Sequence, residues 1–493
     1  TSPGTALTLE QTATTGRGFT IPCPAMIDLK QLRDDPERFK RGARDKGIDV
    51  DIDRLVKLDE QRRRLLAEQE SKRAQQKKLS RKIGPEIGTA MGQLSDADPS
   101  ERKKLEAAIE LLQQQPSTLK TEIQGLDRKI AKIERDWRSL WLEIPQPPDP
   151  DVPKGDSPKD NVEIRRWYPP WFDPNQSFVT NKGFQPKTHL ELLGDLKLAD
   201  FERGVKMAGA RHYVLRGDGM RLHQAVLRLG FDCITDEHGF VAMSLPALVR
   251  EECMVGTGFF PAGRDQAYHI EESTRGAGHD LFLIGTGEVS LMALHADEII
   301  DADALPLKYA TVSTCFRREA GAAGKDTAGL FRVHQFDKVE QVVICRADEA
   351  ESRQWHRTMI EIIETLLQRL ELPYRLVQCC TGDLGPKNAD MIDLECWMPG
   401  RGPLDDAHRP IGAFGETHSA SRLYDYQCRR LNMRYRDQAS GGKTVFCHSL
   451  NNTVIASPRI LIPILELYQN ENGSVTVPQV LRPYMNGQER IGS

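Results

Sequence analysis

The sequence predicts an α+β protein in which a long helical hairpin precedes a domain with a largely antiparallel sheet. Two observations predict this class: a regular seam of apolar residues in the first third of the chain, and helix signals that alternate with β-rich runs in the rest. The 493 residues are enough for two or three domains. No apolar run approaches the ~20 residues that cross a bilayer, so we expect no contact with a membrane.

The hairpin begins with residues 53–83, a run of strong helix formers without Gly or Pro. A Gly- and Pro-rich stretch after Gly84 is expected to form the turn. The second run starts near Glu101, and its apolar residues recur in alternating steps of four and three, as in a coiled coil. They are Leu105, Ile109, Leu112, Leu119, Ile123, Leu126, Ile130, Ile133, Trp137 and Leu140. Pro116 occupies the remaining seam position, where we expect a kink or a break.

The first helix of this hairpin is strongly basic. Residues 54–83 contain eleven Lys or Arg and four Asp or Glu, although the whole chain has a formal net charge of -4. Such a segment suits a polyanion such as RNA. A solvated helix face, or a coiled coil that only joins subunits, would carry the same pattern.

Six prolines between residues 144 and 161 indicate a stiff linker and the clearest domain boundary. We therefore expect a disordered extension over residues 1–25, a helical arm over 26–145, a linker over 146–165 and an α+β domain over 166–493. Within that domain, expected strands lie at 339–345, 374–380 and 393–398, and expected helices at 347–370 and 457–468.

The ten cysteines are scattered, with no C-x-x-C pair and no regular spacing. This distribution indicates reduced thiols in a cytoplasmic protein rather than a disulfide framework. It also offers no zinc-ligand spacing, so we expect no zinc.

Residues 311–340 carry the groups that a nucleotide site needs. The run predicts two strands joined by a Gly-rich loop, with Arg317 on one strand and Arg332 on the other. Arginine binds phosphate and carboxylate groups bidentately, and Phe336 can stack on adenine. An Arg/Glu pair on a strand is usually a surface salt bridge, so the prediction depends on the whole run.

The segment from Phe316 to Glu340 resembles the second signature motif of class II aminoacyl-tRNA synthetases, and in detail that of the seryl-tRNA synthetase family of the bacterial and eukaryotic, zinc-free type. Other stretches agree in the order that the family has them. They are residues 238–246, 255–258, 286–290, 451–453, 457–459 and 481–485. The resemblance runs from Met26 to the C-terminus, and it implies a class II catalytic domain behind a tRNA-binding arm.

The resemblance implies a serine pocket and an ATP site. Serine would be bound by Thr286, Gly287, Glu288, Arg317, Glu340 and Thr453. ATP would be bound by Arg317, Arg318, Glu319, Arg332, Val333, Phe336, Glu416, Thr417, His418, Ser419 and Arg459. Of these, Glu416 and Ser419 would hold Mg²⁺.

The implied reaction is ATP-dependent attachment of L-serine to tRNA(Ser) through a seryl-adenylate, and to tRNA(Sec) where an organism has one. The implied enzyme is a homodimer whose basic arm binds the tRNA. Two alternatives stay open: a ligase that loads an amino acid onto a carrier protein, and a non-catalytic RNA-binding paralogue. The first lacks such an arm, and the second is free to lose Arg317, Glu340 and Arg459.

The chain departs from the family pattern at five places, one of which is Pro458, early in the expected last helix, where a proline is tolerated in the first turn. Gly287 stands where the family usually has Ala, which indicates extra backbone freedom. Thr453 replaces a common Ser and keeps the hydroxyl group. Pro463 is expected to kink the last helix, and residues 402–411 resemble an inserted surface loop.

Overall fold

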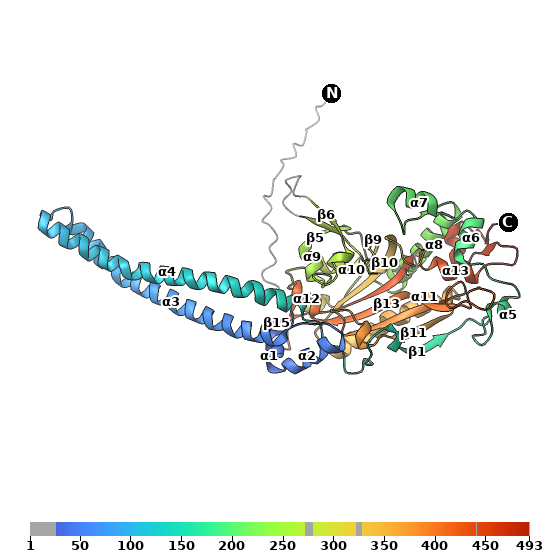
Figure 1. Ribbon diagram of the computed structural model, residues 1–493, viewed down its shortest axis with the longest axis horizontal. Helices are drawn as coiled ribbons and strands as arrows, with labels where there is room; N and C mark the ends of the chain where they lie inside the picture. The colour runs from blue at the N-terminus through green and yellow to red at the C-terminus, as the bar shows by residue number, and fades with distance from the viewer. Residues whose placement is uncertain (1–25, 272–279, 322–327, 440, 493) are drawn as a thin grey trace, which may run out of the picture.

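The computed structural model describes residues 26–271, 280–321, 328–439 and 441–492, and it shows a long arm projecting from an α+β body (Figure 1). The extension expected over residues 1–25 lies outside the described residues. Within these ranges no helix is both long enough and apolar enough to span a membrane.

The arm consists of two antiparallel helices, α3 (Ile52–Gln93) and α4 (Pro99–Glu143). The predicted seam is confirmed, because Leu55, Ile83, Ile109, Ile123, Leu126, Ile130 and Trp137 are buried between them. The turn expected after Gly84 was wrong: α3 continues through Pro85 to Gln93. Helix α4 is likewise unbroken at Pro116. Packing of each helix along the other outweighs the local helix propensity of these prolines.

The root of the arm is a small hydrophobic core of its own. It joins α1 (Leu29–Asp34) and α2 (Pro36–Asp45) to the bases of α3 and α4 through Leu32, Phe39, Trp137 and Trp141. Tyr426, from the body, is part of the same cluster. The root is therefore attached to the body by shared apolar packing.

An eight-stranded sheet forms the centre of the body, in the order β1-β11-β12-β13-β16-β10-β9-β4. All neighbours are antiparallel except β4 and β9, as the predicted fold class requires. The strands are β1 (Val162–Trp167), β4 (Val241–Met243), β9 (Leu307–Phe316), β10 (Gln335–Cys345), β11 (Tyr374–Gln378), β12 (Asp390–Met398), β13 (Ala413–Tyr424) and β16 (His448–Ser457).

Helices α8 (Asp218–Asp232) and α11 (Glu349–Arg369) pack on one face of this sheet and form the main core with it. Along β10, Val339 and Val343 point into that core. Side chains alternate along a strand, so Lys338 and Glu340 point to the opposite face. This opposite face carries the charged groups described below.

The last helix, α13 (Leu461–Leu467), is shorter than the expected 457–468, because β16 extends through Ser457. Pro463 is consequently the third residue of the helix, in the first turn, where a missing backbone N–H costs nothing. The expected kink has no basis there. Residues 402–411 form an exposed loop between β12 and β13, as expected.

Smaller elements complete the body. The helices are α5 (Phe178–Lys182), α6 (His189–Asp195), α7 (Phe201–Ala208), α9 (Glu251–Gly256), α10 (Glu288–Ala293) and α12 (Tyr426–Arg430). The strands are β2 (Ala199–Asp200), β3 (Val214–Leu215), β5 (Leu248–Arg250), β6 (Tyr268–Ile270), β7 (Leu281–Leu283), β8 (Ile299–Ile300), β14 (Arg434–Asp437), β15 (Lys443–Phe446), β17 (Val475–Thr476) and β18 (Arg490–Ile491).

Candidate active site

The β9–β10 hairpin forms one wall of a cavity on the open face of the sheet. Most of the residues predicted to bind ATP line it: Arg317, Glu319, Val333, Phe336, Glu416, Thr417 and Arg459. Arg332 lines an adjoining cavity together with Arg317 and Glu319. Two of the predicted ATP-binding side chains, Arg318 and His418, line neither cavity. Arg318 is exposed to solvent. His418 is buried, and this burial lowers its pKa to about 3.

Three guanidinium groups face these two cavities. The Arg317 Nε atom donates to the Gly285 carbonyl at 3.2 Å, and its guanidinium lies 5.3 Å from the centre of the Phe336 ring. Arg459 donates to the carbonyl groups of Phe331 and Glu416 at 3.0 and 3.1 Å. Burial lowers the pKa of Arg459; the charge of Glu416 opposes that shift, and the positive charges of Arg317 and Arg332 add to it. Such mutual repulsion is relieved by an anion, so the cavity favours polyphosphate.

Glu319 lies between the two cavities in an unusual backbone conformation. Its φ is 50°, in the left-handed region, which costs free energy for a residue other than Gly. Its carboxylate accepts from the Arg332 Nη1 atom at 3.2 Å. The strained backbone and the ion pair together orient this carboxylate toward the cavities.

A buried polar cluster next to the ATP cavity, here called the serine pocket, contains the residues predicted to bind serine, and Thr453 of this cluster lines the cavity itself. Thr286, Glu288, Glu340 and Thr453 are buried and come from the loop before α10, from α10, from β10 and from β16. Glu340 and Thr453 are direct partners in the β10–β16 ladder. Burial raises the pKa of Glu340, and the charge of Lys338 opposes that shift.

Two lysines that sequence analysis did not select complete this pocket. Lys338 forms an ion pair with Glu340 and donates to the Thr286 hydroxyl at 2.8 Å. Lys387 donates to both carboxylate oxygens of Glu288, at 2.6 and 2.7 Å. Alternation along β10 could have found Lys338, two residues before Glu340. Lys387 is 99 residues from Glu288, and no local pattern indicates their contact.

Gly287 is explained by space rather than by backbone freedom. Its φ is -61°, which any residue adopts, so the expectation of extra backbone freedom was wrong. A Cβ atom at this position would lie 2.5 Å from the Thr311 Cγ2 atom and 3.1 Å from the Ser313 hydroxyl. The methyl group of Thr311 therefore fills the volume that an alanine at 287 would need.

A β-bulge brings the two predicted magnesium ligands to one face of β13. Glu416 pairs with Glu395 and Ser419 pairs with Asp393, with the irregularity between them at Thr417. In a regular strand, residues three positions apart such as 416 and 419 would point to opposite faces, and the unpaired Thr417 brings them to the same one. Burial, and then the charge of Glu416, raise the pKa of Asp393 well above its usual range. One Asp393 oxygen is buried without a hydrogen-bond partner, so the group of oxygens fits a divalent cation.

Arg459 is positioned by a buried relay at the end of β16. The His223 ring contacts the Ser457 hydroxyl at 2.7 Å through Nδ1 and the Asp337 carboxylate at 3.0 Å through Nε2. This relay ties α8 to β10 and β16 two residues before Arg459. These contacts therefore fix the backbone at the end of β16, from which the Arg459 side chain extends toward the cavity.

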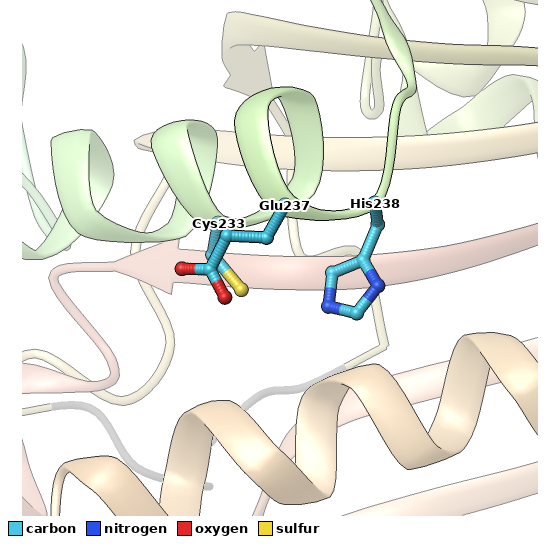
Figure 2. Close-up of side chains that lie close together, drawn as sticks. All are labelled: Cys233, Glu237 and His238. Carbon is cyan, nitrogen blue, oxygen red and sulfur yellow. The ribbon is translucent and has the colours of Figure 1, made fainter.

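A Cys–Glu–His cluster directly follows α8 (Figure 2), and none of its residues lines either cavity. The ligand atoms of Cys233, Glu237 and His238 lie within 4.8 Å of one another. The Glu237 carboxylate already accepts from the Arg369 guanidinium at 2.6 Å, and burial raises the pKa of Cys233 to about 11. Both features oppose cation binding, and we assign no metal there.

Comparison with known proteins agrees with this geometry. Residues 26–148 match the seryl-tRNA synthetase N-terminal domain, and residues 268–468 match the class II tRNA synthetase core domain of the G, H, P, S and T enzymes. A serine–tRNA ligase of Deinococcus radiodurans is 39% identical, covering 95% of this chain and 99% of the relative. One from Thermomicrobium roseum is 41% identical, covering 95% of each chain. The chain belongs to the seryl-tRNA synthetase family.

Solved structures support the same assignment. The seryl-tRNA synthetase of Pyrococcus horikoshii complexed with ATP has a TM-score of 0.74 and 35% identity, over 94% of this chain and 99% of that one. The cytoplasmic serine–tRNA ligase of Naegleria fowleri in complex with AMP has a TM-score of 0.75 and 29% identity, over 95% and 99%. The chain is therefore a class II enzyme that attaches serine to tRNA with ATP as a substrate.

Proposed function

We propose that the pocket beside the ATP cavity binds serine through all three of its polar groups. Glu288 and Thr286 bind the ammonium group, Arg317 binds the carboxylate, and Glu340 and Thr453 bind the side-chain hydroxyl. The observation that carries this proposal is the convergence of these groups, buried and complementary to serine, from separate elements beside Arg317. A pocket built to pair a hydroxyl group rejects alanine, because its own polar groups would be left unpaired.

The chemistry then needs positioning and charge neutralisation rather than a protein nucleophile. A serine carboxylate oxygen bonds to the α-phosphorus, the bond from that phosphorus to the β-phosphate bridge breaks, and pyrophosphate leaves. Arg317, Arg332 and Arg459 neutralise the charge. The terminal ribose hydroxyl of tRNA next attacks the serine carbonyl, and AMP leaves.

Serine-dependent ATP–pyrophosphate exchange tests the pocket directly. We expect exchange with serine and little with alanine or glycine. In Thr453→Val, which keeps the shape but loses the hydroxyl, exchange with serine should fall by about 10- to 100-fold while exchange with alanine stays the same. Equal losses with both amino acids would refute the role of Thr453.

Mg²⁺ belongs to the same proposal. Glu416 and Ser419 would hold it, and the unpartnered oxygen of Asp393 extends the set of oxygens on that face. When bound, the ion would neutralise the phosphates of ATP. Binding of Mn²⁺ in the presence of ATP, followed by water proton relaxation, should weaken in Glu416→Gln. Unchanged binding would place the ion elsewhere.

The arm is the proposed tRNA-binding element, for tRNA(Ser) and for tRNA(Sec) where an organism has one. Its basic helix and its separation from the body support this role (Figure 1). The Arg62 and Glu134 side chains meet at 3.0 Å, so residues 63–133 can be replaced by a short Gly-Ser linker that leaves the root intact. This variant should keep serine-dependent exchange and lose tRNA charging. Normal charging would favour an arm that only joins subunits.

The proposed assembly is a homodimer formed through the edge of the main sheet. Strand β4 is an edge strand, Val241 on it is 54% exposed, and Val312 on the neighbouring strand β9 is 44% exposed. Covering such an apolar edge with a second copy removes a site of aggregation. Sedimentation should show a dimer for the wild type and a monomer for Val241→Glu. If the variant remains a dimer, the interface does not include Val241.

Two finer points complete the proposal. A cytoplasmic location is supported by the cysteines, which are all free among the described residues. The carrier-protein ligase and the non-catalytic paralogue are the alternatives that exchange and charging assays distinguish. Exchange without charging of any tRNA would favour the ligase, and no exchange would favour the paralogue.

A further inference from the structure

The carboxylate proposed to bind the ammonium group of serine already carries an ammonium group from the chain itself. The Lys387 Nζ atom lies 2.6 and 2.7 Å from the two oxygens of Glu288. Only 14% of the lysine side chain and 4% of the glutamate side chain are exposed. Lys387 thus presents the same chemical group, a primary ammonium, at the position where serine must present its own.

The oxygens of Glu288 leave little room for a second cation. Its Oε1 atom accepts from Lys387, from the Gln427 amide at 2.6 Å and from the Asn451 amide at 2.8 Å. An ionised carboxylate offers about four acceptor positions in all. The ammonium group of serine is therefore directed to Oε2, which also accepts from Lys387. Two ammonium groups at one oxygen repel each other strongly in a buried pocket.

The backbone of Lys387 is held from the other side. The buried Lys46 ammonium group, from the root of the arm, donates to the Gly385 carbonyl at 2.9 Å and to the Asn388 carbonyl at 2.5 Å. The backbone N–H of Gln146 donates to the Pro386 carbonyl at 2.8 Å. Lys387 can therefore leave Glu288 only by moving its side chain.

The aromatic ring of Phe259 contacts the Lys387 ammonium group while that group is bound to Glu288. The Lys387 Nζ atom is 4.0 Å from the centre of the ring, a distance at which a cation is attracted to an aromatic face. Phe259 also lines the adjoining cavity. A lysine that leaves Glu288 for this cavity can stay in contact with the ring, so it loses only part of its stabilisation.

We propose that Lys387 competes with the ammonium group of serine for Glu288 and thereby sets the affinity of the pocket for amino acids. This inference rests on the proposed role of Glu288. Ligands with an ammonium group must displace Lys387 or share the carboxylate with it. Ligands without an ammonium group leave the Lys387–Glu288 pair intact.

The test uses the full-length enzyme and the substitution Lys387→Met, which keeps the apolar stem and removes the charge. The KM for serine in ATP–pyrophosphate exchange should fall by about tenfold, with the KM for ATP unchanged. The inhibition constant of L-serinamide, which has an ammonium group, should fall in parallel. That of 3-hydroxypropionate, which has the carboxylate and the hydroxyl only, should stay within about twofold.

An unchanged or raised KM for serine would overturn the proposal, as would a parallel change for 3-hydroxypropionate, because a merely structural lysine would affect both inhibitors. Lys443→Met, at an exposed lysine on β15, is the matched control and should behave as the wild type. If Lys387→Met does not fold, Lys387→Gln is judged by the same criteria. Glu288→Gln tests the underlying role separately: if it binds L-serinamide as tightly as the wild type, the proposed role of Glu288 itself is wrong.

Discussion

The arm and the serine pocket both contain ion pairs, but the two regions use them in opposite ways. In the arm, the side chains of the Arg73–Asp127 pair are 57% and 45% exposed, and those of Arg54 and Asp136 are similarly open to water. In the pocket, the side chains of Lys338 and Glu340 are only 6% and 2% exposed. Exposed pairs contribute little because water and salt screen them, whereas a buried charge without its partner is costly.

This difference teaches how each region tolerates change. The stability of the arm depends on apolar residues of its seam, and its surface charges remain free to contact another molecule. The pocket depends on partners from distant parts of the chain, such as Glu288 and Lys387, and removing one partner leaves the other buried without its counter-charge.

The largest effect is expected at Arg317, which faces both cavities. Arg317→Ala should reduce serine-dependent ATP–pyrophosphate exchange on the order of 10³-fold or more, because it removes charge stabilisation inside a closed site. Arg228→Ala, at an exposed arginine on α8, is the control and should leave exchange unchanged. Near-normal exchange by Arg317→Ala would show that the hairpin does not hold the reacting groups.

A large loss of stability is expected when the Lys338–Glu340 pair is broken. Lys338→Met should lower the free energy of unfolding by about 3 kcal/mol, because Glu340 would remain buried without its partner. The midpoint of urea unfolding measures this. The double variant Lys338→Met/Glu340→Gln, which has no buried charge at the pair, should recover most of the loss. A loss below about 1 kcal/mol in the single variant would contradict the contrast with the arm.

A smaller effect is expected from steric crowding at Gly287. Gly287→Ala should cost about 1–3 kcal/mol of serine binding, seen as a raised KM for serine, because the new methyl group meets the Thr311 Cγ2 atom. Adding Thr311→Ser removes that atom and should restore much of the affinity. If the second substitution restores nothing, the space beside Gly287 has another function.

The smallest effect is expected in the arm. Arg73→Ala removes one partner of an exposed pair and should change the free energy of unfolding by less than about 0.5 kcal/mol. Thermal unfolding at low and high salt checks this. A loss comparable to that of Lys338→Met would mean that the exposure of an ion pair does not determine how much stability is lost when the pair is broken.

Much of the architecture could be predicted because it depends on local patterns. The seam of the arm, the strands around Val339 and Leu394, and the hairpin with Arg317 and Phe336 follow from periodicity and residue type. The errors occurred where tertiary packing outweighed a local signal. Helix α3 passes Gly84 and Pro85, α4 passes Pro116, and β16 delays the start of α13 until Leu461.

The sequence by itself determined the kind of reaction, because the order of the motifs and the types of side chain in them already supply what an aminoacyl-tRNA synthetase needs. Only the tertiary structure decided which residues contact those groups and which charges neutralise them. The bulge at Thr417 brings Glu416 and Ser419 to one face, the methyl group of Thr311 explains Gly287, and Lys387 reaches Glu288 from 99 residues away. The physical reason is that charge and volume in a buried pocket depend on which distant residues share it, and no local periodicity records that.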